Sequence, residues 1–492
     1  MSKQIADIAM IGLAVMGQNF VLNMADHGFT VAAFDREADV VDKFIANDAI
    51  GKSIIGTHSV EEMVATLKRP RRVMLLIKAG KPVDSVIEQL VPLLEKDDII
   101  IDGGNSHYLD TTRRYDFLKS KGIYFVGSGV SGGEEGARHG PSLMPGGAIE
   151  AWPAIKPIFL AVAAKADGEP CCDWVGPAGA GHYVKMVHNG IEYGDMQLIS
   201  ESYDLMKRLA GLSDKEISEV MGRWNQGFLD SFLIEVTRDI LAFNDDGRIP
   251  LVEEIMDMAG QKGTGKWTAI DALDKGMPVT LIGQAVFSRC LSALKGERAR
   301  ASKVLSGPTI KPIPASVRKQ FIDDLEQALY ASKIISYAQG FMLIREAAKE
   351  FKWDLNFPSI PLMWRGGCII RSAFLGEITK AYREDKYLEN LLFHPFFRSA
   401  IEKAQSGWRK SVTKAVVNGI PTPAFATALS FYDDYKSERL PANLLQAQRD
   451  YFGAHTFSIL PKYAHDKVKP GKNIHINWTG KGVDVSAGTY DA

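Results

Sequence analysis

The sequence lacks the features that mark secreted and membrane proteins. Only four of its 492 residues are cysteines, too few and too scattered for a disulfide framework or a zinc site: Cys171, Cys172, Cys290 and Cys368. No apolar run is long enough to span a bilayer. The opening residues show no hydrophobic segment followed by a cleavage site of small residues. We therefore expect a cytoplasmic protein with no membrane partner.

The sequence also lacks an excess of charge of either sign. It contains 58 Lys and Arg residues and 59 Asp and Glu residues, which gives a formal net charge of -1. A chain this balanced has no global positive field that would attract nucleic acid or acidic lipid. We expect no nucleic-acid partner, and any site for an anionic ligand must be built from a local cluster of cations.

Three regions with different sequence patterns follow one another along the chain. Residues 1–177 alternate short β-branched or apolar runs with helical stretches, which predicts an α/β domain with a parallel sheet. The strands expected there lie at residues 5–12, 29–35, 72–77, 98–102 and 123–127. Amphipathic helical patterns dominate residues 178–435 and predict a large all-α domain. Residues 436–492 form a C-terminal segment that we expect to end in an extended tail.

A G-x-A-x-x-G turn follows the first expected strand and opens a helical stretch. In such a turn the glycines allow a tight bend and close helix packing, and the helix N-terminus presents N–H groups to phosphates. The position between a strand and a helix predicts dinucleotide binding by a Rossmann-type domain. All six residues of the turn are candidate cofactor contacts: Gly12, Leu13, Ala14, Val15, Met16 and Gly17.

The residues after the second expected strand give conflicting indications of cofactor choice. Asp35, Arg36 and Glu37 stand there, and all three are candidate cofactor-binding residues. A carboxylate at Asp35 favours the ribose 2′-hydroxyl of NAD, whereas Arg36 could pair with the 2′-phosphate of NADP. Arg36 could also be a solvated loop residue without a ligand.

A polar stripe follows a glycine-rich entry at residue 179. Its five residues occupy one helical face at the spacings i, i+3, i+4, i+7 and i+8: Lys185, His188, Asn189, Glu192 and Tyr193. One interpretation is a solvent-facing stripe with a Lys-Glu salt bridge. The His, Asn and Tyr side chains favour a catalytic face. No cluster of His, Cys and carboxylates has metal-ligand spacing, so we expect no metal.

Residues 260–266 satisfy the first seven positions of a phosphate-binding loop, which raises the alternative of a phosphotransferase. The eighth position must be Ser or Thr to hold magnesium, and it is Trp267. The preceding residues 252–259 are typical of a helix, whereas such a loop follows a strand. Both observations argue against a phosphotransferase.

Six sequence blocks resemble the signature blocks of the 6-phosphogluconate dehydrogenase family. In chain order they are GLAVMGQN (12–19), IDGGNS (101–106), VSGGEEGAR (130–138), KMVHNGIEYGDMQL (185–198), GQKGTGKWT (260–268) and LLQAQRDYFGAHTF (444–457). The similarity extends to the final NWTG at residues 477–480. The resemblance implies metal-free oxidation and decarboxylation of 6-phosphogluconate to ribulose 5-phosphate with NADP, a step of the pentose phosphate pathway.

The resemblance also implies a role for individual residues. Lys185 matches the general base and Glu192 the general acid of the family. The implied substrate contacts are Asn105, Ser131, Gly132, Gly133, His188, Asn189, Tyr193, Lys262, Thr264, Arg289, Arg449 and His455. The implied cofactor contacts, beyond the turn at residues 12–17, are Arg36, Lys78 and Asn105.

The sequence departs from the family at the residues that follow the second strand. The family usually has Asn-Arg-Thr there, and this chain has Asp35-Arg36-Glu37. Two added carboxylates should repel a 2′-phosphate. NADP is the expected cofactor and NAD the alternative.

The resemblance finally implies a homodimer whose residues 436–492 reach the partner's active site. Two alternative functions are considered: a β-hydroxyacid dehydrogenase acting on an unphosphorylated acid, and a nucleotide sensor without catalysis. The cations Lys262, Arg289 and Arg449 argue against the first, because an unphosphorylated acid does not need them. The second should have lost Lys185 or Glu192, and both are present.

Overall fold

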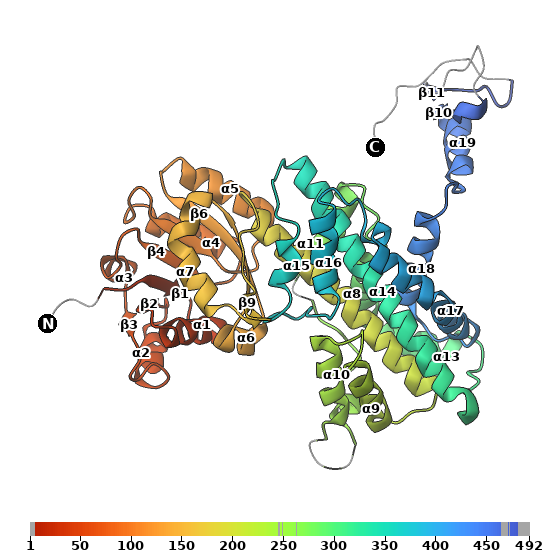
Figure 1. Cartoon of the computed structure of the whole chain (residues 1–492), viewed down its shortest axis with the longest axis horizontal. Helices are drawn as coiled ribbons and strands as arrows, with labels where there is room; N and C mark the ends of the chain where they lie inside the picture. Colours follow the sequence, from red (N-terminus) through yellow and green to blue (C-terminus); the bar gives the residue numbers. More distant parts are fainter. Residues whose placement is uncertain are drawn as a thin grey trace. The chain divides into compact units, whose positions relative to one another are not determined.

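The computed structural model describes residues 5–244, 247, 249–261, 263–463, 471 and 473–480 (Figure 1). The chain divides into two compact units, Met1–Leu429 and Ser430–Ala492. None of the helices within the described ranges combines the length and the apolar character needed to cross a membrane.

The first unit begins with a seven-stranded sheet in the order β3-β2-β1-β4-β5-β6-β7. Its strands are β1 (Ile8–Ile11), β2 (Val31–Phe34), β3 (Ile54–Thr57), β4 (Arg72–Leu75), β5 (Ile99–Asp102), β6 (Tyr124–Ser131) and β7 (Ser142–Gly147). Neighbouring strands from β3 to β6 are parallel, as in a Rossmann-type domain, while β7 runs antiparallel to β6.

The five expected strands are confirmed, whereas β3 and β7 were missed. The expected parallel sheet is confirmed from β3 to β6, and β7 adds an antiparallel edge strand. The sequence of β7 contains Pro145, Gly146 and Gly147, which single-sequence rules read as a loop. It forms a strand because it is the edge of the sheet, where pairing with β6 along six residues outweighs a weak local preference.

Helices cover both faces of the sheet, because successive apolar side chains of β1 point to opposite faces and both faces must be buried. Ile8 and Met10 point into the core under α1, α2, α6 and α7, and Ala9 and Ile11 into the core under α3, α4 and α5. These helices are α1 (Val15–Asp26), α2 (Ala38–Ala46), α3 (Val60–Ala65), α4 (Lys81–Leu90), α5 (Tyr108–Lys119), α6 (Gly133–His139) and α7 (Trp152–Val162). A 3-10 turn η1 (Ile149–Ala151) and the hairpin of β8 (Lys165–Ala166) and β9 (Glu169–Pro170) complete this part.

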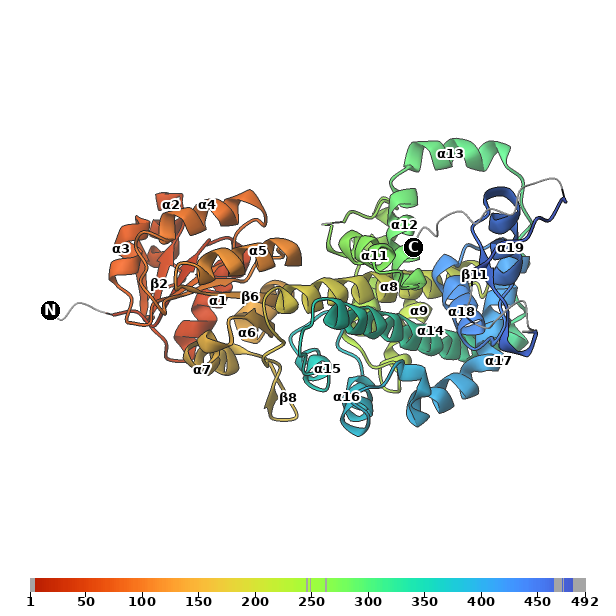
Figure 2. The same cartoon turned by 90° about the horizontal axis from the view of Figure 1, so that it is seen from above.

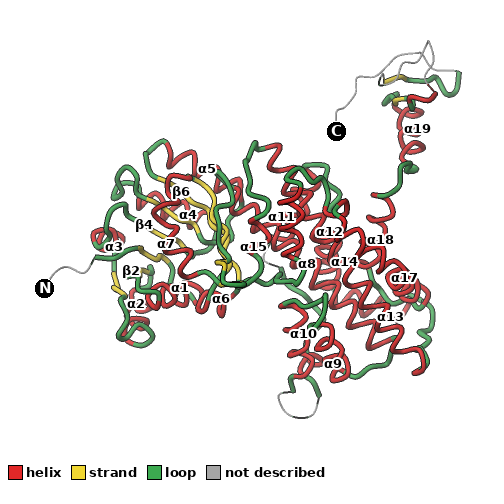
Figure 3. Tube along the Cα trace, viewed as in Figure 1, coloured by secondary structure: helices red, strands yellow, loops and turns green. Residues whose placement is uncertain are grey.

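Helices dominate the rest of the first unit, as Figure 3 shows by its colours. They are α8 (Ala180–Arg208), α9 (Asp214–Trp224), α10 (Phe232–Ala242), α11 (Thr264–Asp274), α12 (Thr280–Ser292), α13 (Lys295–Val304), α14 (Ala315–Glu350), α15 (Ser359–Met363), α16 (Leu375–Glu384) and α17 (Pro395–Val417). Two 3-10 turns, η2 (Leu251–Glu254) and η3 (Leu391–Phe393), lie between them. The boundary between the two units falls within α18 (Pro423–Tyr435).

The helix expected at residues 252–259 is absent, which corrects the sequence-based prediction. Only η2 forms there, and the residues that follow it are not helical. Ile255 and Met256 are 62% and 65% exposed. A short helix is stable only when it buries an apolar face, and this segment buries none.

The long helices α8 and α14 run side by side through the helical part (Figure 2). A buried ion pair joins them, between Asp195 of α8 and Lys333 of α14, whose side chains are 0% and 1% exposed. Tyr337 of α14 donates a further hydrogen bond to the same carboxylate. The pair lies one helical turn beyond Glu192 and therefore fixes the helix that carries the polar stripe.

The second unit contains a helix and a small antiparallel strand pair. These elements are α19 (Ala442–Gly453), β10 (Phe457–Ser458), β11 (Asn473–Ile474) and the 3-10 turn η4 (Pro461–Tyr463). The extended tail expected at the end of this segment lies largely outside the described residues.

We expect Lys333→Met to lower the free energy of unfolding by about 3–5 kcal/mol, because it leaves the Asp195 carboxylate buried without its cation. Lys319→Met is the matched control, since Lys319 lies on the same helix in an ion pair with Asp323 and its side chain is 89% exposed. It should change stability by less than about 0.5 kcal/mol. Chemical denaturation of both variants measures the difference, and equal losses would contradict the structural role of the buried pair.

Candidate active site

The glycine-rich turn after β1 is closed tightly and fits a dinucleotide. Gly12 has a φ of 101°, and a Cβ on Gly17 would clash with the carbonyl oxygen of Gly12. No side chain caps the start of α1 at Ala14. The backbone can therefore approach a pyrophosphate group, and the positive end of the helix faces it.

Asp35 holds this turn in place. Its Oδ2 accepts the backbone N–H of Leu13 at 2.8 Å, and its Oδ1 accepts that of Glu37 at 3.1 Å. The carboxylate thus ties the turn after β1 to the residues that follow β2. This structural role was not foreseen from the sequence, where Asp35 was considered as a ligand of the ribose or as a charge that repels the 2′-phosphate.

The other candidate cofactor contacts lie on loops at the same edge of the sheet. Arg36 pairs with Glu37 at 3.2 Å, with side chains 89% and 64% exposed. Lys78 follows β4 and Asn105 follows β5, and both are exposed. Because the carboxyl ends of parallel strands share one edge, these residues surround the place where a Rossmann-type domain binds its nucleotide.

The polar stripe of α8 is buried, which rules out the solvent-facing interpretation. Lys185, His188, Asn189 and Tyr193 are at most 9% exposed, and Glu192 is half-buried. Five polar side chains on a buried helical face indicate a binding or catalytic site, because burial of polar groups is costly unless they have partners.

A chain of hydrogen bonds brings four of the expected substrate residues together. Ser131 Oγ lies 3.2 Å from His188 Nε2, and His188 Nδ1 lies 2.9 Å from Asn189 Oδ1. Asn189 Nδ2 donates to Thr264 Oγ1 at 2.9 Å. The pattern fits a neutral imidazole that donates from Nδ1 and accepts at Nε2. Burial, reinforced by Lys185, holds the pKa of His188 well below its usual range.

Lys185 lies beside this chain, with Nζ 3.4 Å from His188 Nδ1. Burial lowers the pKa of Lys185 to about 8, against the opposing effects of Glu192 and Cys368. Among the described residues, no neighbouring cation contributes to the lowered pKa of Lys185. Gly129 of β6 permits this burial, because a Cβ there would lie 2.5 Å from the Cβ of Lys185.

Arg289 and Tyr193 form a second part of the site. The guanidinium carbon of Arg289 lies 3.6 Å from the centre of the Tyr193 ring, a cation–π contact. Arg289 Nη1 also donates to the carbonyl oxygen of Gly260 at 2.9 Å. The stacked guanidinium is held in one orientation next to the loop that carries Lys262, although Lys262 itself lies outside the described residues.

The Ser131-Gly132-Gly133 turn lies at the start of α6. Gly132 and Gly133 have φ values of 118° and 62°, and Gly132 packs against the carbonyl oxygen of Gly367. Residues 364–368 were missed by the sequence-based reasoning. Trp364 contacts the His188 ring edge-on at 5.7 Å, and a tryptophan in a helical region gives no sign that it faces a site.

In the second unit, Arg449 and His455 flank a buried aspartate. Asp450 Oδ1 accepts the backbone N–H of Thr456 and lies 2.9 Å from His475 Nδ1. Its Oδ2 accepts hydrogen bonds from the backbone N–H of Ile476 and from the indole of Trp478. The Asp450 carboxylate thus holds together the segment that carries Arg449 and His455, the two expected substrate contacts.

No metal site is apparent in the part of the chain that the structure describes. No group of three or more His, Cys, Asp or Glu side chains there could hold an ion.

Comparison with protein families gives two matches that together span nearly the whole chain. Residues 7–176 match the NAD binding domain of 6-phosphogluconate dehydrogenase, and residues 181–478 match the 6-phosphogluconate dehydrogenase C-terminal domain.

Individual proteins give the same result. The chain is 72% identical over 487 residues to a decarboxylating 6-phosphogluconate dehydrogenase of Saccharomyces cerevisiae, covering 99% of this chain and 100% of the relative. Identity to the decarboxylating enzyme of Mus musculus is 62% over 488 residues, 99% of each chain. The 6-phosphogluconate dehydrogenase of Plasmodium falciparum, solved alone, with NADP+ and with 6-phosphogluconate, superposes with a TM-score of 0.92 at 43% identity, covering 96% of this chain and 100% of that one.

We expect Asp450→Asn to loosen the fold of the C-terminal segment. Burial alone would raise the pKa of Asp450, but hydrogen bonds from His475 and Trp478 keep it below its usual value, so the carboxylate is charged at neutral pH. Its stabilising effect is present above the unfolded pKa of about 3.9 and is lost as the pH falls through the folded pKa. Loss of the charge should speed hydrogen exchange at the amides of Thr456 and Ile476 by roughly tenfold or more.

Hydrogen–deuterium exchange of peptides covering these two amides measures the effect at pH 7. Glu438→Gln is the control, because Glu438 is an exposed carboxylate of the same unit. Unchanged exchange in the Asp450 variant would show that the carboxylate does not hold the segment.

Proposed function

The chain belongs to the 6-phosphogluconate dehydrogenase family, and on that premise we propose a role in the reaction for each residue of the site. Its activity is the oxidation and decarboxylation of 6-phosphogluconate with NADP as the cofactor. The observation that carries the proposal is Lys185, a buried lysine whose pKa is lowered to about 8 on a face of polar side chains. Such a lysine can act as a base near neutral pH.

The residues that would hold NADP are the turn at residues 12–17, Arg36, Lys78 and Asn105. The closed turn and the uncapped start of α1 suit the pyrophosphate, and Arg36 supplies the charge for the 2′-phosphate. Of the two carboxylates expected to repel that phosphate, Asp35 is engaged by backbone N–H groups and Glu37 by Arg36. Both engagements reduce the repulsion. Bound NADP supplies the acceptor for the hydride that leaves carbon 3.

Lys185 acts as the general base and then as a general acid. Its neutral amine takes the proton of the carbon 3 hydroxyl as that carbon is oxidised to a ketone. The resulting ammonium donates a hydrogen bond to the ketone oxygen and stabilises the negative charge that develops when carbon 1 leaves as carbon dioxide. A lysine can in this way supply the positive charge that a divalent ion supplies elsewhere.

Glu192 completes the reaction by donating a proton to the former carbon 2 of the substrate, which is carbon 1 of the five-carbon enediol, and this gives ribulose 5-phosphate. It lies two helical turns from Lys185 on the same face of α8, so the two groups can serve different atoms of one substrate. Its half-buried position leaves it accessible to a bound ligand.

The remaining residues bind the two charged ends of the substrate. The N–H groups of the Ser131-Gly132-Gly133 turn suit the carboxylate, with His188 and Asn189 on the hydroxyl groups. The phosphate is assigned to Tyr193, Lys262, Thr264 and Arg289, and to the partner's Arg449 and the partner's His455. The stacking of Arg289 on Tyr193 supports this assignment, because it holds a guanidinium group at the site. A chain with almost no net charge needs such a local cation to bind a phosphate.

The second unit supports a homodimer with shared active sites. Within that unit, apolar side chains line a groove on α19 and the segment after it: Leu444, Ala447, Tyr451, Phe452 and Trp478. Leu444 and Phe452 are 61% and 73% exposed. An exposed apolar groove of this kind is typical of a surface that packs on another chain. We propose that it packs on the partner and brings Arg449 and His455 to the partner's site.

Two further expectations stay predictions. The reaction is expected to need no metal, because Lys185 can stabilise the charge that develops during decarboxylation. The chain is expected to act in the cytoplasm.

We predict that Lys185→Ala slows hydride transfer by about 10²–10⁴-fold, whereas Glu192→Gln leaves hydride transfer nearly intact and slows protonation of the enediol. In the parent, the rate of hydride transfer should rise with pH through about 8 as Lys185 loses its proton. Single-turnover absorbance of the reduced nicotinamide measures the hydride step, and release of ribulose 5-phosphate measures the later one. A Lys185 variant that reduces NADP at the parent rate would refute the assignment.

We predict that mixed dimers of Lys185→Ala and Arg449→Ala chains recover activity. When the partner supplies Arg449, one site of a mixed dimer has both defects and the other has none. Random exchange makes about half of the dimers mixed, so activity should approach roughly a quarter of the parent value. Donation within one chain would leave a defect in every site, and confirmed mixed dimers as inactive as either variant alone would refute sharing.

A further inference from the structure

Two neighbouring loops of the nucleotide-binding domain carry residues assigned to the cofactor. The loop after β4 contains Lys78, and the loop after β5 contains Asn105. The two strands pair in parallel, so both loops leave the sheet at the same edge. Lys78 and Asn105 are exposed, and their positions therefore depend on how the loops beneath them are held.

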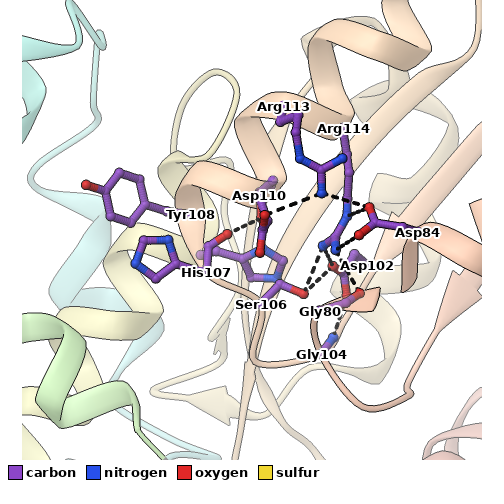
Figure 4. A network of polar contacts seen from close by, with 12 residues as sticks. Gly80, Asp84, Asp102, Gly104, Ser106, His107, Tyr108, Asp110, Arg113 and Arg114 are labelled. Carbon is purple, nitrogen blue, oxygen red and sulfur yellow. Dashed lines mark hydrogen bonds and ion pairs between the residues drawn. The ribbon is translucent and has the colours of Figure 1, made fainter. Parts of the chain in front are cut away.

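Arg114 of α5 joins these two loops. Its Nε and Nη2 donate to the two carboxylate oxygens of Asp84 at 2.8 and 3.2 Å, and Nη2 also donates to the carbonyl oxygen of Gly80 at 3.0 Å. Its Nη1 donates to Asp102 Oδ2 and to Ser106 Oγ, both at 3.4 Å. Figure 4 shows the guanidinium lying between the Asp84 side and the Asp102 side. All five N–H donors of the guanidinium are used.

Asp102 extends the network to the loop that bears Asn105. Its Oδ1 accepts the backbone N–H of Gly104 at 3.0 Å, and its Oδ2 accepts the Ser106 hydroxyl at 2.6 Å (Figure 4). Asn105 lies between these two anchored residues. The backbone of the loop is thus fixed on both sides of the side chain that is assigned to both cofactor and substrate.

The burial of Arg114 makes the arrangement specific to a guanidinium. The side chain is 1% exposed, and Asp102 is fully buried. A lysine has three donors on one nitrogen and cannot reach both loops with the same geometry. The contacts are polar and lie at the two loops and at the first turn of α4, where Asp84 stands, whereas α5 docks on the sheet through Leu118 and Tyr115. Fixing the helix therefore does not require Arg114.

We propose that Arg114 is a positioning residue that holds the loops of Lys78 and Asn105 in one arrangement and thereby sets the affinity for NADP. This inference rests on the proposed assignment of Lys78 and Asn105 to the cofactor. Arg114 itself is buried under the loops and acts through them.

Arg114→Lys tests the proposal, with Arg113→Lys as the matched control. Arg113 is the preceding residue on α5 and also contacts Asp84, but its side chain is 56% exposed and it reaches neither Gly80 nor Asp102. The Kd of NADP should rise roughly tenfold to a hundredfold in the Arg114 variant, as expected when contact residues are misplaced. It should change by less than about twofold in the control. The thermal midpoint identifies any variant that fails to fold, and Asp84→Asn then takes its place, with a smaller loss of affinity expected.

The same substitution in a Lys78→Ala, Asn105→Ala background separates positioning from a general loss of structure. With the positioned side chains gone, Arg114→Lys should change the Kd of NADP by less than about twofold. An effect of full size in that background, or parent affinity in Arg114→Lys, would overturn the inference while leaving the cofactor contacts in place. Parent affinity in the Lys78→Ala, Asn105→Ala chain would instead overturn the proposed contacts, and the inference with them.

Discussion

The close packing of α8 against β6 is the constraint on which the rest of the site depends. Gly129 lets the backbone of β6 approach Lys185, and the contact removes the lysine from water. Burial in turn lowers the pKa of Lys185 to about 8, near the pH at which a base must work. A larger residue at 129 would push the helix away and return the amine to solvent, where a lysine stays protonated at neutral pH.

Most of the residues with a proposed catalytic role therefore lie on α8, and the neighbouring helices hold these side chains in position. The buried pair of Asp195 and Lys333 fixes α8 against α14, one helical turn beyond Glu192. Thr264 at the start of α11 receives a hydrogen bond from Asn189, which orients that amide and through it the ring of His188. These supports come from elements far apart in the sequence. A rigid catalytic face is therefore a property of the assembled helical part and not of α8 alone.

Arginines serve two distinct purposes in a chain whose net charge is nearly zero. Arg114 is buried, and all five of its N–H groups donate hydrogen bonds to protein atoms, so its role is to organise loops. Arg36 is largely exposed, and Arg289 stacks on an aromatic ring, so both keep donors available to an anion. The exposure of each arginine and the number of its hydrogen-bond partners within the protein distinguish an arginine that organises loops from one that can bind an anion. Amino-acid composition does not distinguish them. Local cation clusters can thus bind a doubly charged substrate without a global positive field.

Features that depend on neighbouring residues could be predicted from the amino-acid sequence. The turn after β1, most of the parallel strands and the polar stripe of α8 all follow from short-range spacing, and the structure contains them. Four features could be seen only in the folded chain: the stripe is buried, β7 joins the sheet antiparallel, Asp35 fastens the glycine-rich turn and Arg114 bridges two loops. Each of these depends on contacts between residues distant in the chain. Burial and hydrogen-bond partners are set by the packed fold, and no local pattern encodes them.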